Sequence, residues 1–144
     1  MNSKNPTGTV LYSIEQSIKA YRKISQKNIS KIVKDITVDQ CLILIILQTD
    51  STIYQNELAN LIFKDKASVT RMIELMVKKE YLIRDIDTED RRKFNLELTE
   101  KGKKTFDLIS PVIKQNRATA LNGLSLDEIA LLDKVLNKII INCK

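Results

Sequence analysis

The order of hydrophobic patterns between residues 55 and 98 most strongly limits what this chain can fold into. Apolar residues at helical spacing predict a short helix from residue 55, the polar run at 64–66 predicts a turn, and a second apolar stripe predicts a helix over 66–79. Residues 81–86 and 94–98 suit β-strands, because the second segment alternates apolar and polar side chains. A helix-turn-helix followed directly by a β-hairpin predicts a winged helix.

Amphipathic segments precede this unit. Residues 9–36 carry apolar side chains at helical spacing, with lysines on another face, and predict one long helix. Thr37 and Gln40 have the spacing of a capping box, in which each side chain bonds the backbone N–H of the other residue. They predict the start of a second helix, whose dense leucine and isoleucine content indicates burial on most sides.

Two further helices are expected after the hairpin. Thr99 is placed to cap a long helix, which Pro111 should kink and which Gly123 should end. Ser125 and Glu128 repeat the capping-box spacing and predict the start of a last helix.

These elements predict a mainly α fold with a small antiparallel β wing, an α+β class, in a single domain over residues 1–144. Residues 37–98 form the winged helix-turn-helix, and residues 9–36 and 99–143 form a helical part. The apolar stripes of the first and last helices lie outside the winged unit and must be buried against something. A second copy of the chain is the simplest partner, so we expect a homodimer joined by the helical part.

Composition argues against several classes of function. The chain has no histidine, which is the commonest general base and transition-metal ligand, and its two cysteines, Cys41 and Cys143, form no metal-binding pair. Its acidic residues lie in predicted loops without a base or nucleophile nearby, so we expect no enzyme, catalytic residue, metal or cofactor. No apolar run approaches the roughly 18 residues of a membrane span, which favours a cytoplasmic protein without a membrane partner. The formal charge of +6 favours a polyanionic partner.

The second helix of the helix-turn-helix has a polar, cationic face near its N-terminus. This face consists of Lys66, Ser68, Thr70 and Arg71, while apolar residues on the other face hold the helix to the core. Cations and short hydroxyls suit base edges and phosphates in a major groove. The alternative is that the hydroxyls are only solvated, but the adjacent hairpin favours double-stranded DNA.

The loop between the two strands carries three cations in a row, Arg91, Arg92 and Lys93. An arginine at a hairpin tip can enter a narrow minor groove, where the negative potential is strongest. Acidic residues also occupy the loop and would repel DNA unless they are paired, and Asp90 near Arg84 or Arg92 provides such a pair. The alternative is a solvated, charge-rich turn.

Residues 57–102 resemble the MarR family of bacterial winged-helix regulators. The most specific match is Asp-x-Arg at Asp90 and Arg92, followed by Leu-Thr-x-x-Gly at Leu98, Thr99 and Gly102. The flanking helices match in order and length, so the resemblance covers almost the whole chain.

The resemblance implies a homodimer joined by its terminal helices, with each recognition helix in a major groove and each wing at a minor groove. It implies that Arg92 is the wing arginine and that Asp90 holds it or a neighbouring arginine. It also implies that the polar face of the recognition helix contacts DNA.

Two positions depart from the family pattern. Phe63 and Glu80 stand where family members often have glycine, at the turn of the helix-turn-helix and just after the recognition helix. A bulky residue at positive φ costs roughly 1 kcal/mol or more, so we expect adjusted turns at both positions.

The resemblance further implies a small, often aromatic or anionic effector bound where the dimer helices meet the winged unit. Ser25 and Asn28, near Tyr21, fall on the otherwise apolar side of the first helix and are candidates to line such a pocket. The alternative is that they make local hydrogen bonds. Cys41 lies among aliphatic residues, which should raise its pKa and make a thiol switch unfavourable.

Together these features predict a sequence-specific regulator of transcription, a ligand-responsive repressor that binds a pseudo-palindromic operator as a homodimer. The competing hypothesis is a winged-helix module that binds a partner protein and has little affinity for DNA.

Overall fold

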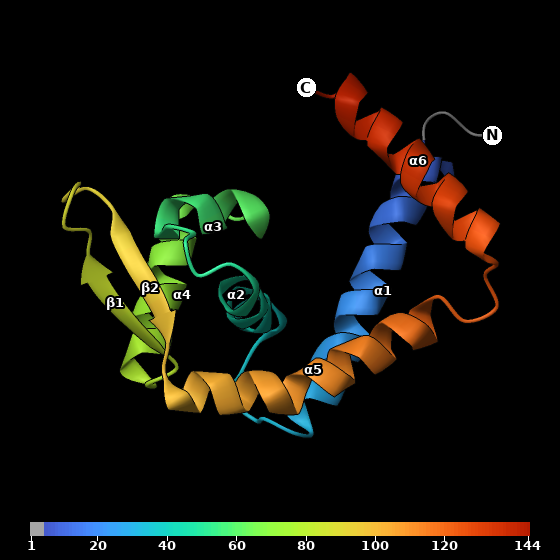
Figure 1. Cartoon of the computed structure of the whole chain (residues 1–144). Helices are drawn as coiled ribbons and strands as arrows, with labels where there is room; N and C mark the ends of the chain where they lie inside the picture. The colour runs from blue at the N-terminus through green and yellow to red at the C-terminus, as the bar shows by residue number, and fades with distance from the viewer. Residues whose placement is uncertain (1–4) are drawn as a thin grey trace.

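The computed structural model describes residues 5–144 and confirms a mainly helical fold with a two-stranded wing. Figure 1 shows a lobe built from α2, α3, α4 and the hairpin, and an arm built from α1, the end of α5 and α6. The elements in chain order are the 3₁₀ helix η1 (Pro6–Gly8), α1 (Val10–Ser30), α2 (Val38–Thr49), α3 (Gln55–Leu61), α4 (Lys66–Lys78), β1 (Leu82–Ile86), β2 (Phe94–Leu98), α5 (Glu100–Ala120) and α6 (Leu126–Asn142).

The core lies inside the lobe. Apolar side chains from α2, α3, α4 and both strands are fully buried there, and Ile29 of α1 and Ile109 of α5 join them. β1 and β2 pair antiparallel with Leu82 opposite Leu98 and Ile86 opposite Phe94. The hairpin therefore leaves the core at its Leu82 end and projects its 87–93 loop outward.

The predicted helix starts are confirmed by their hydrogen bonds. In the first capping box, the Gln40 N–H donates to Thr37 Oγ1 over 3.1 Å and the Thr37 N–H donates to Gln40 Oε1 over 3.0 Å. Ser125 and Glu128 make the same reciprocal pair at the start of α6. Such caps satisfy N–H groups that have no partner within the helix.

The prediction of one helix over 9–36 is wrong, because α1 ends at Ser30. The Gln26 side chain donates to Ile36 O and accepts from the Val38 N–H, both over 3.0 Å, so the chain after α1 folds back against the helix. Ile29 and Ile36 are both buried in the core, which explains their spacing without a continuous helix.

Pro111 lies inside α5, as predicted, and the helix continues on both sides of it. Figure 1 shows α5 changing direction near its middle as it passes from the lobe into the arm. Proline removes one hydrogen-bond donor and crowds the preceding turn, which bends a helix at that position.

The expectation of adjusted turns at Phe63 and Glu80 is wrong. Both residues keep the left-handed conformation, with φ of 60° and 67°. The Lys64 N–H donates to Ala59 O over 3.0 Å, and the Tyr81 N–H donates to Met76 O over 2.9 Å. This six-to-one bond is the helix-ending pattern in which glycine is usual after the cap. α3 and α4 therefore both end in a glycine-type turn that holds a bulky residue.

The arm keeps much apolar surface uncovered within one chain. Within the described chain, α6 has no buried residue, and its exposed side chains include Leu126, Leu131, Leu132, Ile140 and Ile141. Within residues 5–144, no helix is both long enough and apolar enough to pass through a membrane. The apolar face of α6 matches the predicted surface for a second chain.

Candidate nucleic-acid interface

The start of α4 is fixed by a polar cap. Asp65 precedes the helix, and its carboxylate accepts the Ser68 N–H over 2.8 Å and the Ser68 hydroxyl over 2.7 Å. Hydrogen bonds from Ser68 lower the pKa of Asp65 below its usual value. Arg71 donates to Ser68 Oγ over 3.3 Å, so the Ser68 hydroxyl is occupied by the cap and by Arg71. Arg71 is exposed and leaves this end of α4 cationic.

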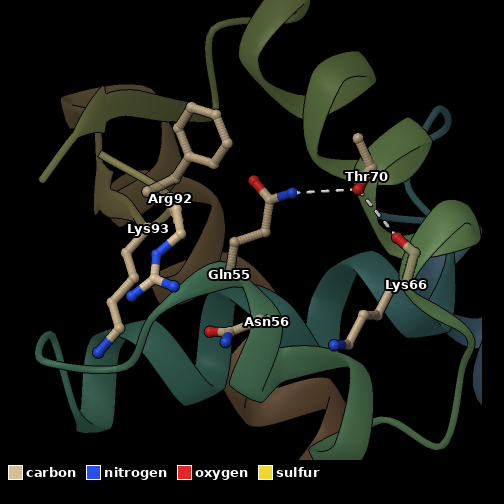
Figure 2. Close-up of a pocket in the computed structure, with 7 residues that line it drawn as sticks. Gln55, Asn56, Lys66, Thr70, Arg92 and Lys93 are labelled. Atoms are coloured by element: carbon tan, nitrogen blue, oxygen red, sulfur yellow. Dashed lines mark hydrogen bonds between the residues drawn. The ribbon is translucent and has the colours of Figure 1, made fainter. Parts of the chain in front are cut away.

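Thr70 is also engaged within the protein. Its hydroxyl donates to Lys66 O over 2.9 Å and accepts from the Gln55 amide over 3.2 Å, as the dashed lines in Figure 2 show. Gln55 is only 9% exposed and opens α3, so it locks the Thr70 side chain from the neighbouring helix. Sequence reasoning missed this role, because the contact joins two different helices and has no local pattern.

The wing is folded around Asp90. The backbone N–H and the Nε of Arg92 donate to Asp90 Oδ1 over 3.0 and 3.1 Å, and Arg92 Nη2 donates to Oδ2 over 3.2 Å. These hydrogen bonds lower the pKa of Asp90 below its usual value, so the carboxylate stays ionised. Arg92 is nevertheless almost fully exposed, with 90% of its side chain open to solvent.

The remaining wing cations have different partners. Arg84, the other predicted partner of Asp90, instead lies over the Phe94 ring, 4.7 Å from its centroid. Lys93 lies over the Tyr54 ring at 4.6 Å, whereas Arg91 is exposed. The quadrupole of an aromatic ring attracts a cation that lies over its face. The Lys93–Tyr54 contact therefore holds the wing to the start of α3, and the Arg84–Phe94 contact joins β1 to β2.

The wing and α4 meet at one small concavity, which we call the wing hollow. Its volume is about 140 Å³. Figure 2 shows α3 at its base, with Lys66 and Thr70 on one side and the wing residues on the other. Its lining residues are Gln55, Asn56, Lys66, Thr70, Arg92, Lys93 and Phe94, none of them acidic. The structure thus brings together predicted residues from two elements, while Ser68, Arg71 and Arg91 lie outside this hollow.

A second concavity, which we call the helix hollow, lies between α1, α2 and α5. It has a volume of about 220 Å³, and Tyr21 and Ser25 line it, together with the cations Arg22 and Arg117. Among the described residues, the buried Ser25 hydroxyl has no hydrogen-bond partner. Asn28 does not line the hollow, because its amide donates to Asn116 Oδ1 over 2.8 Å. Cys41 also lines it, and burial raises the pKa of its thiol to about 12.

The elements form a winged helix-turn-helix with a cationic face where α4 meets the wing. The family model for MarR matches residues 36–94. Over these residues the chain is similar to the MarR family.

Three solved structures show how closely the fold is shared. A mutant of MarR from E. coli complexed with operator DNA is 23% identical, with 96% of both chains covered and a TM-score of 0.82. The transcriptional regulator SlyA is 26% identical, with 93% of both chains covered and a TM-score of 0.81. BpsR of Bordetella bronchiseptica, whose DNA binding is regulated by 6-hydroxynicotinic acid, is 21% identical, with 94% of this chain and 95% of that chain covered and a TM-score of 0.83.

Proposed function

We propose that this chain is a sequence-specific, DNA-binding repressor of transcription that acts as a homodimer and responds to a small anionic ligand. The observation that carries this proposal is the wing hollow, where Lys66 of α4 meets Arg92 and Lys93 of the wing. Cations from two elements on one face suit a polyanion that follows both elements, as a duplex does. The proposed function involves no catalytic step, and we propose that the protein acts in the cytoplasm, where it would meet its operator.

In the proposed complex, α4 lies in the major groove and the tip of the wing reaches the minor groove. Lys66 and Arg71 contact phosphates or bases directly, whereas Ser68 and Thr70 act through their contacts with Arg71 and Gln55. Because the Thr70 hydroxyl already donates to Lys66 O and accepts from Gln55, it has no proton left to donate to a base, and its methyl group is available for base contact. Arg92 provides the cation at the tip, held by Asp90.

The homodimer is supported by the apolar face of α6. Exposed leucine and isoleucine side chains on a terminal helix favour burial against an equal surface of a second chain. A two-fold axis would present two α4 helices to half-sites about 34–36 Å apart, one helical turn of DNA. The operator is therefore expected to be pseudo-palindromic.

The ligand response is supported by the helix hollow. Arg22 and Arg117 provide positive charge, and the buried hydroxyl of Ser25 provides a hydrogen bond. The other lining groups are largely apolar, so the hollow suits a small aromatic ring with a carboxylate. Asn28 does not line this site, but its amide donates a hydrogen bond to Asn116, the neighbour of Arg117 in α5.

The test of the DNA-binding function is selection of bound duplexes from a random pool, followed by anisotropy titration of the enriched duplex. Selection is expected to enrich an inverted repeat, and the affinity should fall steeply with salt as phosphate contacts release counterions. Lys66→Ala should reduce the salt slope by about one, whereas exposed Lys138→Ala in α6 should leave it unchanged. Absence of enrichment, together with a flat salt dependence, would favour the protein-interaction module instead.

A further inference from the structure

Asp39, in the first turn of α2, is shared by two cations from separate elements. Arg22 of α1 donates from Nη2 to Asp39 Oδ1, and Lys64 places its Nζ 3.6 Å from Asp39 Oδ2. Only 14% of the Asp39 side chain is exposed, compared with 40% for Arg22 and 44% for Lys64. A largely buried carboxylate is stable only while a cation balances it, so the three side chains form one unit.

The two ends of this unit reach different parts of the molecule. Arg22 lines the helix hollow beside Ser25. Lys64 lies in the turn between α3 and α4, directly after Phe63 in its left-handed conformation and directly before Asp65, which caps α4. A single carboxylate therefore connects the wall of the helix hollow to the turn that sets the position of α4.

We propose that Arg22, Asp39 and Lys64 couple ligand binding in the helix hollow to the position of α4, the proposed recognition helix. This inference rests on the proposed function. A ligand carboxylate in the hollow competes with Asp39 for the guanidinium of Arg22. Asp39 then keeps a balancing cation by drawing Lys64 inward, from 3.6 Å towards the usual distance of about 2.8 Å for a charged hydrogen bond. The turn at Phe63 and Lys64 moves with it and shifts α4 against the wing.

Coupling through Asp39 predicts a result that an ion pair with only a stabilising role does not predict. If the ligand and Asp39 compete for the same arginine, removing the charge of Asp39 should strengthen ligand binding. The same substitution should abolish the effect of the ligand on DNA, because the connection to Lys64 is lost. Coupling between two sites is reciprocal, so it can be measured from either side.

The test uses the full chain, the selected operator and benzoate as the probe, with benzamide as its uncharged counterpart. For the wild type, saturating benzoate is expected to weaken operator binding by about fivefold or more, and benzamide should have no such effect. For Asp39→Asn, calorimetry should show benzoate binding at least about threefold more tightly, while the operator affinity responds by less than about 1.5-fold. Asp107→Asn, an equal charge change at an exposed position of α5, should behave as the wild type.

A second variant keeps the test decisive if Asp39→Asn does not fold. Lys64→Met leaves the lining of the hollow intact but removes the second cation of Asp39, so benzoate should bind more weakly than to the wild type, and the operator affinity should no longer respond. The inference is overturned if benzoate does not bind, if it weakens operator binding equally in the wild type and both variants, or if Asp39→Asn binds benzoate less tightly. A wild type that binds no duplex at all would overturn the proposed function as well, which separates the two failures.

Discussion

The guanidinium of Arg92 donates a hydrogen bond to each carboxylate oxygen of Asp90, from Nε over 3.1 Å and from Nη2 over 3.2 Å. The backbone N–H of Arg92 donates to the same carboxylate, so the loop and the side chain are fixed by one residue. An exposed arginine normally samples many conformations, and this one is held in a single orientation at the tip of the wing. Asp90 is thus a positioning group, although its charge alone would oppose DNA.

Arg92→Ala is expected to lower operator affinity by about tenfold, within the roughly 1–3 kcal/mol range of single protein–DNA contacts. The fold should be unaffected, because 90% of this side chain is exposed. Asp90→Asn provides the sharper comparison, because simple electrostatics predicts tighter binding and loss of positioning predicts weaker binding. We expect weaker binding, measured by fluorescence anisotropy with circular dichroism as the folding control. Tighter binding by Asp90→Asn would refute the positioning role.

Phe63→Gly and Glu80→Gly are each expected to raise the free energy of unfolding by about 1 kcal/mol, because glycine adopts positive φ without steric strain. Phe63 is 91% exposed, so its replacement removes almost no buried apolar surface. Urea denaturation measures the change, with Lys104→Gly inside α5 as a control that should destabilise by about 1 kcal/mol. A loss of stability in either turn variant would show that the side chain makes up for its strained backbone.

Gly102→Ala is expected to destabilise the protein by about 1–3 kcal/mol through overpacking. A Cβ atom at this position would lie 2.3 Å from the Tyr81 carbonyl oxygen, which belongs to the backbone and cannot rotate away. That same oxygen accepts the Thr99 N–H over 3.1 Å at the junction of the wing and α5. Thermal unfolding should therefore separate this variant from Lys103→Ala at the next, exposed position, which should be close to neutral.

Stability is expected to fall as the pH rises from about 9 to about 12. Burial raises the pKa of Cys41 from 9.0 to about 12, and burial together with the hydrogen bond to Asp35 raises the pKa of Tyr81 from 10.0 to about 12. The unfolded chain therefore loses these protons at lower pH than the folded chain, so their contribution is complete below pH 9 and disappears through pH 12. Denaturant titrations at several pH values measure this slope, and Cys41→Ala should reduce it.

A thiol assay at pH 8 provides a second check on the same shift. Cys143 is exposed and should react with a disulfide reagent, whereas the buried Cys41 should react only after unfolding. Equal reaction rates for both thiols in the folded protein would contradict the shifted pKa.

Local patterns predicted most of the fold correctly. Capping boxes at Thr37 and Ser125 depend on residues three apart, so the sequence contains everything needed to find them. The end of α1 could not be found in this way, because it depends on Gln26 reaching the backbone around Ile36. Helical spacing of core isoleucines on both sides of a turn resembles one helix when only the sequence is known.

The candidate interface was predicted less completely than the fold. Lys66, Arg92 and Lys93 do meet at the wing hollow, because the order of elements places α4 beside the hairpin. The partners of Thr70 and Arg84 were not foreseen, since Gln55 reaches Thr70 from another helix and Phe94 reaches Arg84 across the strands. The pair of Arg22 and Asp39 joins two helices and has no local sequence signal.

The uncovered face of α6 has a consequence for how the chain would respond to its own abundance. In the proposed homodimer a second copy covers this face, so the pairing of chains depends on concentration. Well below the concentration at which half the chains pair, doubling their number raises the number of pairs about fourfold. Gene dosage and protein turnover would then determine how much of the operator is bound, independently of any ligand.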